Sequence, residues 1–115
     1  MNRELKVEDY IRTKKGWIAK IVNINDFREP SMKYGVEASY LKDIGFIGDE
    51  DIKISSPNII DLIEVGDYVN GRLVFDINGT LFAQEIGALE DIIIKSVVTH
   101  EQFESMEYRV ESEVN

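Results

Sequence analysis

The chain has 115 residues, no cysteine and a formal net charge of −9. Structural disulfides, thiolate zinc sites and cysteine nucleophiles are therefore excluded. Its length fits a single domain over residues 1–115, and 43 % of its residues are hydrophobic, enough for a modest core. No apolar run approaches the roughly 18 residues of a membrane-spanning helix, and the first residues do not form a secretory signal. We therefore expect a soluble, cytoplasmic protein with no membrane partner.

The charge is distributed unevenly along the chain. Residues 1–42 carry nine Lys/Arg against six Asp/Glu, whereas residues 43–115 carry four against sixteen, which gives local charges of +3 and −12. An acidic surface repels phosphate, so direct nucleic-acid binding is disfavoured. Such a surface either keeps the protein soluble or docks on a basic partner, such as one that normally holds nucleic acid. The residues that we assign to such a contact are Asp43, Asp49, Glu50, Asp51, Asp61 and Glu64.

The first predicted element is a β-hairpin, with strands over residues 7–12 and 17–24 and a polar turn that ends in glycine. This turn is the most basic region of the chain. Aromatic side chains beside cations hold single-stranded nucleic acids, so the region is an alternative site for a small ligand or a single strand. A lone tryptophan at a strand start is equally typical of a core anchor or lid. The patch comprises Tyr10, Arg12, Lys14, Lys15, Trp17 and Lys20.

The middle of the chain predicts a loop followed by a strand. Residues 25–32 contain turn-forming residues and Pro30, and residues 34–41 alternate loosely between apolar and polar. Residues 49–51 are three consecutive acids, but they lack the alternate ligand spacing and the turn glycine of a calcium loop. We therefore predict a solvated loop there and no metal site.

The stretch from residue 55 to 74 predicts a short helix and the entry to a strand. Ser56 is a good N-cap, Pro57 suits the next position, and isoleucines recur at helical spacing over residues 59–63. Gly66 then ends the helix. An extended run that begins at the next residues leads into the second half of the chain.

A second hairpin follows. Residues 72–77 read as a strand, Asn78-Gly79 favours a type I′ turn, and residues 80–85 form the return strand. Residues 89–94 follow, and their apolar run Ile92-Ile93-Ile94 predicts one more strand.

The C-terminal region predicts a helical turn and a frayed tail over residues 111–115. Thr99 and Gln102 have the spacing of a capping box. His100 is the only histidine, and in a first helical turn its imidazole is expected to be exposed, so we predict neither a catalytic triad nor a multi-histidine metal site. The chain also lacks a glycine-rich phosphate loop. These observations predict a protein that is not an enzyme and that has no catalytic residues and no cofactor.

One short segment occurs twice: residues 7–11 (VEDYI) are echoed by residues 65–69 (VGDYV). This five-residue motif resembles the sequence at which small barrels of the Tudor and KOW type begin. In those barrels the aspartate closes a turn and the tyrosine covers the barrel end. The resemblance implies a mainly β fold of two similar strand-turn-strand units. We expect a small Src-homology-3-like barrel or sandwich with two short helical segments.

Three longer segments resemble a family of small uncharacterised proteins from genomes, prophages and mobile elements of low-GC Gram-positive bacteria (Firmicutes). They are residues 7–21, residues 56–71 (SPNIIDLIEVGDYVNG) and residues 94–110, which begin IKSVVTHEQFE. In that family the middle, here about residues 25–54, varies, and no catalytic residues are carried over. The resemblance implies a phage- or prophage-borne protein in a bacterial cytoplasm.

Together with the acidic charge, this origin leads us to expect a binding protein that inhibits a host protein. A defence nuclease is a suitable target, because carboxylates would occupy its basic channel, as in an anti-CRISPR-type inhibitor. Two other interpretations stay open. One is the barrel that binds a small ligand or a single strand through Trp17, and the other is a housekeeping protein of the mobile element.

Overall fold

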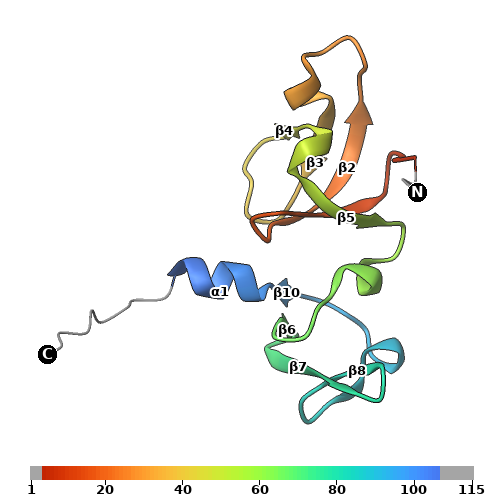
Figure 1. Cartoon of the computed structure of the whole chain (residues 1–115), viewed down its shortest axis with the longest axis vertical. Coiled ribbons are helices and arrows are strands. Elements are labelled where there is room, and N and C mark those ends of the chain that lie inside the picture. Colours follow the sequence, from red (N-terminus) through yellow and green to blue (C-terminus); the bar gives the residue numbers. More distant parts are fainter. Residues whose placement is uncertain (1–3, 107–115) are drawn as a thin grey trace, which may run out of the picture.

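The computed structural model describes residues 4–106, which form two β lobes stacked along the long axis of the molecule (Figure 1). The expected frayed tail at residues 111–115 lies outside this range. The first lobe contains β1 (Tyr10–Thr13), β2 (Ile18–Ile24), η1 (Pro30–Met32), β3 (Tyr34–Glu37), β4 (Gly45–Ile47), η2 (Asp49–Asp51) and β5 (Ile52–Ser56). The second contains β6 (Tyr68–Val69), β7 (Arg72–Ile77), β8 (Thr80–Ala83), β9 (Gly87–Ala88), η4 (Leu89–Asp91), β10 (Val97–Val98) and α1 (His100–Met106). A single 3₁₀ turn, η3 (Ile59–Leu62), connects them.

The two lobes have the same strand order. Their antiparallel sheets run β4-β3-β2-β1-β5 and β9-β8-β7-β6-β10, so in each lobe four strands form a meander and the fifth returns to pair with the first. A 3₁₀ turn precedes the returning strand in both. The predicted mainly β fold is therefore confirmed. Among residues 4–106, no helix has the length and apolar character needed to cross a membrane.

The echoed segment builds the same turn in both lobes. Asp9 and Asp67 are both buried, and each carboxylate accepts a hydrogen bond from the backbone amide three residues earlier, at 2.9 and 2.8 Å. The residue before each aspartate has a positive φ, 83° and 97°. Ile21 and Val74 occupy equivalent positions, because the amide of each donates to the carbonyl of its turn aspartate at 2.8 Å. The short sequence echo thus marks a structural repeat.

Each lobe has its own hydrophobic core. Ile11 and Val69, which follow the tyrosine in each copy of the echoed segment, are both fully buried. The buried cluster of the first lobe is Ile11, Ala19, Ile21, Tyr34 and Val36, and that of the second is Ile63, Val69, Val74, Ala83 and Leu89. Burial of these side chains is the main force that stabilises each sheet.

The two strongest local signals of the second half are confirmed. Asn78 and Gly79 both have positive φ, 52° and 89°, and close the β7–β8 hairpin. Thr99 and Gln102 form the capping box, because the Thr99 amide donates to Gln102 Oε1 at 2.9 Å and the Gln102 amide donates to Thr99 Oγ1 at 3.2 Å. The helix α1 begins directly after this cap.

The predicted helix at residues 59–63 is only the single 3₁₀ turn η3. Ser56 ends β5, and its hydroxyl accepts from the Asn58 amide at 3.1 Å and donates to Asp61 at 2.5 Å. The serine therefore starts the turn, but Asn58 is the residue that flanks the helix. The helix cannot continue because Ile63 is already extended on the way into the Asp67 turn.

The predicted strand at Ile92-Ile93-Ile94 is wrong. Residues Leu89–Asp91 form η4, and the extended segment after it has no strand beside it. The side chain of Asn70 takes the place of a strand: it donates to the Ile93 carbonyl at 2.8 Å and accepts from the amides of Lys95 and Ser96 at 2.7 and 3.1 Å. The apolar run is therefore held by one distant side chain, which an apolar pattern does not reveal.

Candidate functional site

The barrel of the first lobe is open at the end where β1 turns into β2. We call this hollow of about 320 Å³ the apolar mouth. Its rim consists of Trp17, Tyr40, Leu41 and Phe46, whose exposed fractions are 42, 45, 37 and 42 %, and fully buried Ile11 lies in its floor. The β1–β2 turn and the β3–β4 loop supply the rim because these two connections meet at the same end of the sheet.

The aromatic side chains of the apolar mouth are held by one another and by a cation. The rings of Trp17 and Tyr40 lie with their centroids 4.8 Å apart at 41°, and the Arg28 guanidinium lies 4.7 Å from the centre of the Phe46 ring. Burial raises the pKa of Tyr40. Such preordered aromatic groups can receive an apolar side chain or stack on a planar one.

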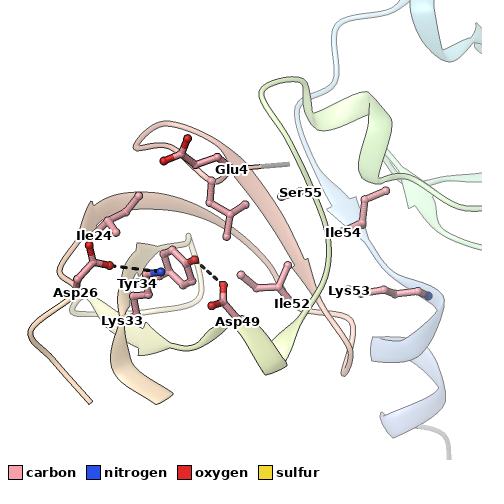
Figure 2. Close-up of a pocket in the computed structure, with 11 residues that line it drawn as sticks. Glu4, Ile24, Asp26, Lys33, Tyr34, Asp49, Ile52, Lys53, Ile54 and Ser55 are labelled. Atoms are coloured by element: carbon pink, nitrogen blue, oxygen red, sulfur yellow. Dashed lines mark hydrogen bonds and ion pairs between the residues drawn. The ribbon is translucent and has the colours of Figure 1, made fainter. Parts of the chain in front are cut away.

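The opposite end of the barrel is polar and holds a larger hollow of about 730 Å³. Figure 2 shows two pairs of polar groups that meet there: the Tyr34 hydroxyl donates to Asp49 at 2.5 Å, and Lys33 lies 3.4 Å from Asp26. Burial, together with the hydrogen bond to Asp49, raises the pKa of Tyr34. Because these groups satisfy one another, we interpret this end as structural despite its size.

The six acids assigned to a partner contact come from four places in the fold. Asp43 lies in the β3–β4 loop and the three consecutive acids form η2, where the Asp51 carboxylate accepts from the Gly48 amide at 3.0 Å. Asp61 accepts from Ser56 in η3. The exposed acids among the six are Asp43, Asp49, Glu50, Asp51 and Asp61. The sixth acid, Glu64, is not a surface acid of this kind, because it lies in the junction between the lobes.

A cluster of ionised side chains joins the two lobes, and we call it the junction cluster: Arg12, Lys53, Glu64, Asp67, His100 and Glu101. Arg12 of β1 is at its centre and is fully buried. Its guanidinium donates to Asp67 at 2.6 and 3.0 Å, to the Leu62 carbonyl at 2.8 Å, and to Glu101. The assignment of Arg12 to a nucleic-acid patch is therefore wrong, because Asp67 and Glu101 neutralise its charge inside the protein.

The outer part of the junction cluster completes the ion pairing. Lys53 of β5 lies 2.9 Å from Glu64 and 3.3 Å from Glu101, and His100 Nε2 lies 2.9 Å from Glu64. The ligand atoms of Glu64, His100 and Glu101 lie within 4.8 Å of one another, close enough for a metal ion. However, Arg12 and Lys53 already neutralise both carboxylates, so a divalent cation would have to displace two cations. We interpret the cluster as an internal ion-pair network.

The basic patch expected from the sequence is divided by the structure. Tyr10 and Lys20 face each other on the outer side of the sheet, where the Lys20 ammonium lies 5.4 Å from the tyrosine ring and 3.4 Å from Glu8. Lys14 and Lys15 are exposed in the β1–β2 turn beside Trp17. Of the six predicted residues, only the turn lysines and Trp17 stay together at the apolar mouth.

The junction cluster shifts the pKa of its members. The hydrogen bond to Glu64 raises the pKa of His100, against the opposing effect of burial. Burial alone would raise the pKa of Glu64 and of Glu101. Hydrogen bonds from Lys53 and His100 to Glu64, and from Arg12 to Glu101, outweigh burial and lower both values.

These shifts predict a pH optimum of stability. The raised pKa of His100 adds stability that is complete below about pH 6.5 and is lost as the pH rises through the folded-state pKa; the lowered values of the two glutamates add stability above about pH 4.5 that is lost in acid. His100→Gln should therefore flatten the decline above about pH 6.5, and it should weaken but not abolish the acid limb, because Lys53 still lowers the pKa of Glu64. Urea midpoints across pH 3–9 measure this. An unchanged slope on the alkaline side would contradict it.

Comparisons with protein-family models, curated proteins and solved structures each give no match. The apolar mouth is therefore interpreted from its geometry. Sequence reasoning found Trp17 but missed Tyr40, Leu41 and Phe46, which lie more than twenty residues further along the chain. The available signal was a group of large apolar residues in a segment otherwise interpreted as a loop and a weak strand.

Proposed function

We propose that this chain is a non-catalytic binding protein whose apolar mouth receives a side chain or short segment of a partner protein. The observation that carries the proposal is the ring of four large, part-exposed apolar side chains around a hollow with a buried floor. Clustered exposed apolar groups mark interaction sites, and aromatic anchors in pockets supply most interface energy.

The partner that fits the overall charge is a basic host protein. A chain with a net charge of −9 is drawn toward a positive surface, and the exposed acids Asp43 and Glu50 lie in the loop and the turn next to the strands that form the apolar mouth. We therefore propose a phage- or prophage-borne inhibitor that docks on a nucleic-acid-binding defence effector, such as a CRISPR nuclease. In that role the apolar mouth anchors the contact and the acids compete with nucleic acid.

The test is truncation of Trp17. Once a partner has been isolated with a tagged full-length chain, Trp17→Ala should weaken binding by about 2 kcal/mol or more, roughly thirtyfold, because an anchor residue is removed. Phe27→Ala is the matched control, since Phe27 is a fully exposed aromatic residue of the same lobe outside the apolar mouth. Calorimetric titration of both variants measures the difference. Equal affinity of the two variants, or no stoichiometric partner at low or physiological salt, would contradict the proposal.

A second candidate function is a barrel that binds single-stranded nucleic acid. It is favoured by one observation, that Lys14 and Lys15 lie in the turn beside the Trp17–Tyr40 ring pair. Stacking of a base contributes about 1–3 kcal/mol. Trp17 is the only tryptophan, so quenching of its fluorescence by an oligonucleotide at low salt, reversed at high salt, would support this function. No quenching at low salt would eliminate it.

A further inference from the structure

The sheet of the second lobe has an outer face that the fold leaves uncovered. Strand pairing places Tyr68 opposite Leu73 and Val98, Phe75 opposite Phe82, and Ile77 opposite Thr80. These pairs share the face that points away from the core cluster of Val69, Val74 and Ala83, because side chains alternate along a strand. We call this surface the outer face: Tyr68, Leu73, Phe75, Ile77, Phe82 and Val98, with small Thr80 and Ala88.

The outer face contains no charged residue. An antiparallel sheet that covers a core on one side normally presents polar residues on the other, and 30 % of this chain is charged. Instead, Phe75 and Phe82 stack with centroids 5.8 Å apart, and Ile77 is 49 % exposed. The helix α1 reaches only one end of the outer face, where the ring centroids of Phe103 and Tyr68 lie 4.6 Å apart. Apolar residues on both faces are typical of a sheet that is packed against other structure on both sides.

The first lobe shows how the same scaffold treats this face when it is not an interface. With Ile21 aligned to Val74, the position of Leu73 carries Lys20, and the outward positions near it carry Arg12 and Glu37. Arg12 is buried against the second lobe, and the other two charged residues face solvent. Charged residues thus occupy part of that face, and the position of Phe82 carries Gly35 instead of a large apolar residue. In the second lobe, the described residues provide neither a cover nor a charge for Leu73, Phe75 and Ile77.

We infer that the outer face of the second lobe packs against the same face of a second copy in a two-fold dimer. Two copies with a charge of −9 each repel one another, so they can associate closely only where the contact contains no charge. A surface that binds a basic partner would instead carry carboxylates, and the outer face has none. A two-fold contact brings identical patches together, and sheet faces pack at about 10 Å. This surface is distinct from the apolar mouth, and the inference does not depend on the proposed function.

The size of the outer face indicates a weak dimer. Five strands spaced about 4.8 Å apart, with a longest strand of six residues, span on the order of 500 Å². Stable interfaces bury about 800 Å² per partner. We therefore expect an association that depends on protein concentration. Added salt should strengthen this association, because it screens the mutual repulsion of the two acidic chains. Added salt would instead weaken the binding of a basic partner.

Sedimentation equilibrium of the full chain tests the inference, from about 5 to 500 µM protein and at low and high salt (about 0.05 and 0.5 M). The mass should rise from 13.2 kDa toward twice that value, more so at high salt. Phe75→Lys and Ile77→Lys should each weaken association at least about tenfold, because both place a charge in the contact. Ile93→Lys is the matched control: Ile93 is 78 % exposed in the same lobe but lies off the outer face.

Circular dichroism establishes that each variant is folded, and Ile77→Lys decides the result if Phe75→Lys does not fold. A monomer at the highest concentration in high salt overturns the inference. Association that survives both lysine substitutions, or that Ile93→Lys weakens equally, also overturns it. Loss of association in the two face variants with an unchanged Ile93→Lys variant supports it.

Discussion

Arg12→Met should destabilise the protein by about 3–5 kcal/mol, the usual effect of removing one partner of a buried ion pair. Methionine fills much of the space but leaves the Asp67 carboxylate, which is fully buried, without its counter-ion. It also removes the donor to the Leu62 carbonyl. Urea unfolding followed by far-ultraviolet circular dichroism measures the loss.

Arg72→Met is the control for this substitution. Arg72 also pairs with a glutamate, Glu85, but both side chains are about half exposed or more, so the expected loss is at most about 1 kcal/mol. In a double-mutant cycle, Asp67→Asn combined with Arg12→Met should cost less than the sum of the two single changes. Equal stability of the Arg12 and Arg72 variants would show that the junction cluster does not hold the lobes together.

Ile21→Ala should cost about 2–5 kcal/mol, because it leaves a cavity in the core of the first lobe. Ile21 is fully buried in that core, and Val74 is its equivalent in the second lobe. Val74→Ala should cost less, since fewer atoms are removed. Trp17 belongs to the first lobe, so comparison of its fluorescence with circular dichroism also reveals whether the lobes unfold together. Unfolding curves from Trp17 fluorescence and from circular dichroism measure both effects.

Because the junction cluster ties the lobes, we expect the two probes to give coincident transitions for wild type and for both variants. The decisive case is Val74→Ala. If it lowers the midpoint seen by circular dichroism while the Trp17 transition keeps its wild-type midpoint, the lobes unfold independently. A loss below 1 kcal/mol for Ile21→Ala would likewise contradict the position of this side chain in a closed core.

The features that could be predicted from the sequence are those specified by neighbouring residues. The Asn78-Gly79 turn needs positive φ at two adjacent positions, and the Thr99–Gln102 box is a pair three residues apart. The echo at residues 65–69 worked for the same reason, since each copy closes its turn with its own aspartate. These signals placed the hairpins and the repeated unit correctly.

The features that could not be predicted depend on residues distant in the chain. Arg12 is surrounded in sequence by lysines of an exposed turn, yet its partner Asp67 lies 55 residues away. Tyr40 and Phe46 join Trp17 only because the β1–β2 and β3–β4 connections meet at one end of the barrel. His100 looked like an exposed imidazole, but the Glu64 carboxylate, 36 residues earlier, binds it. A pattern within one segment does not contain such pairings.

Asp67 forms bonds that stabilise both lobes, and this affects which substitutions the protein can tolerate. Asp9 closes the corresponding turn of the first lobe. Asp67 closes its own turn, accepts from the His100 amide and neutralises Arg12. A mutation at Asp67 therefore affects both lobes at once, so we expect this position to tolerate few substitutions.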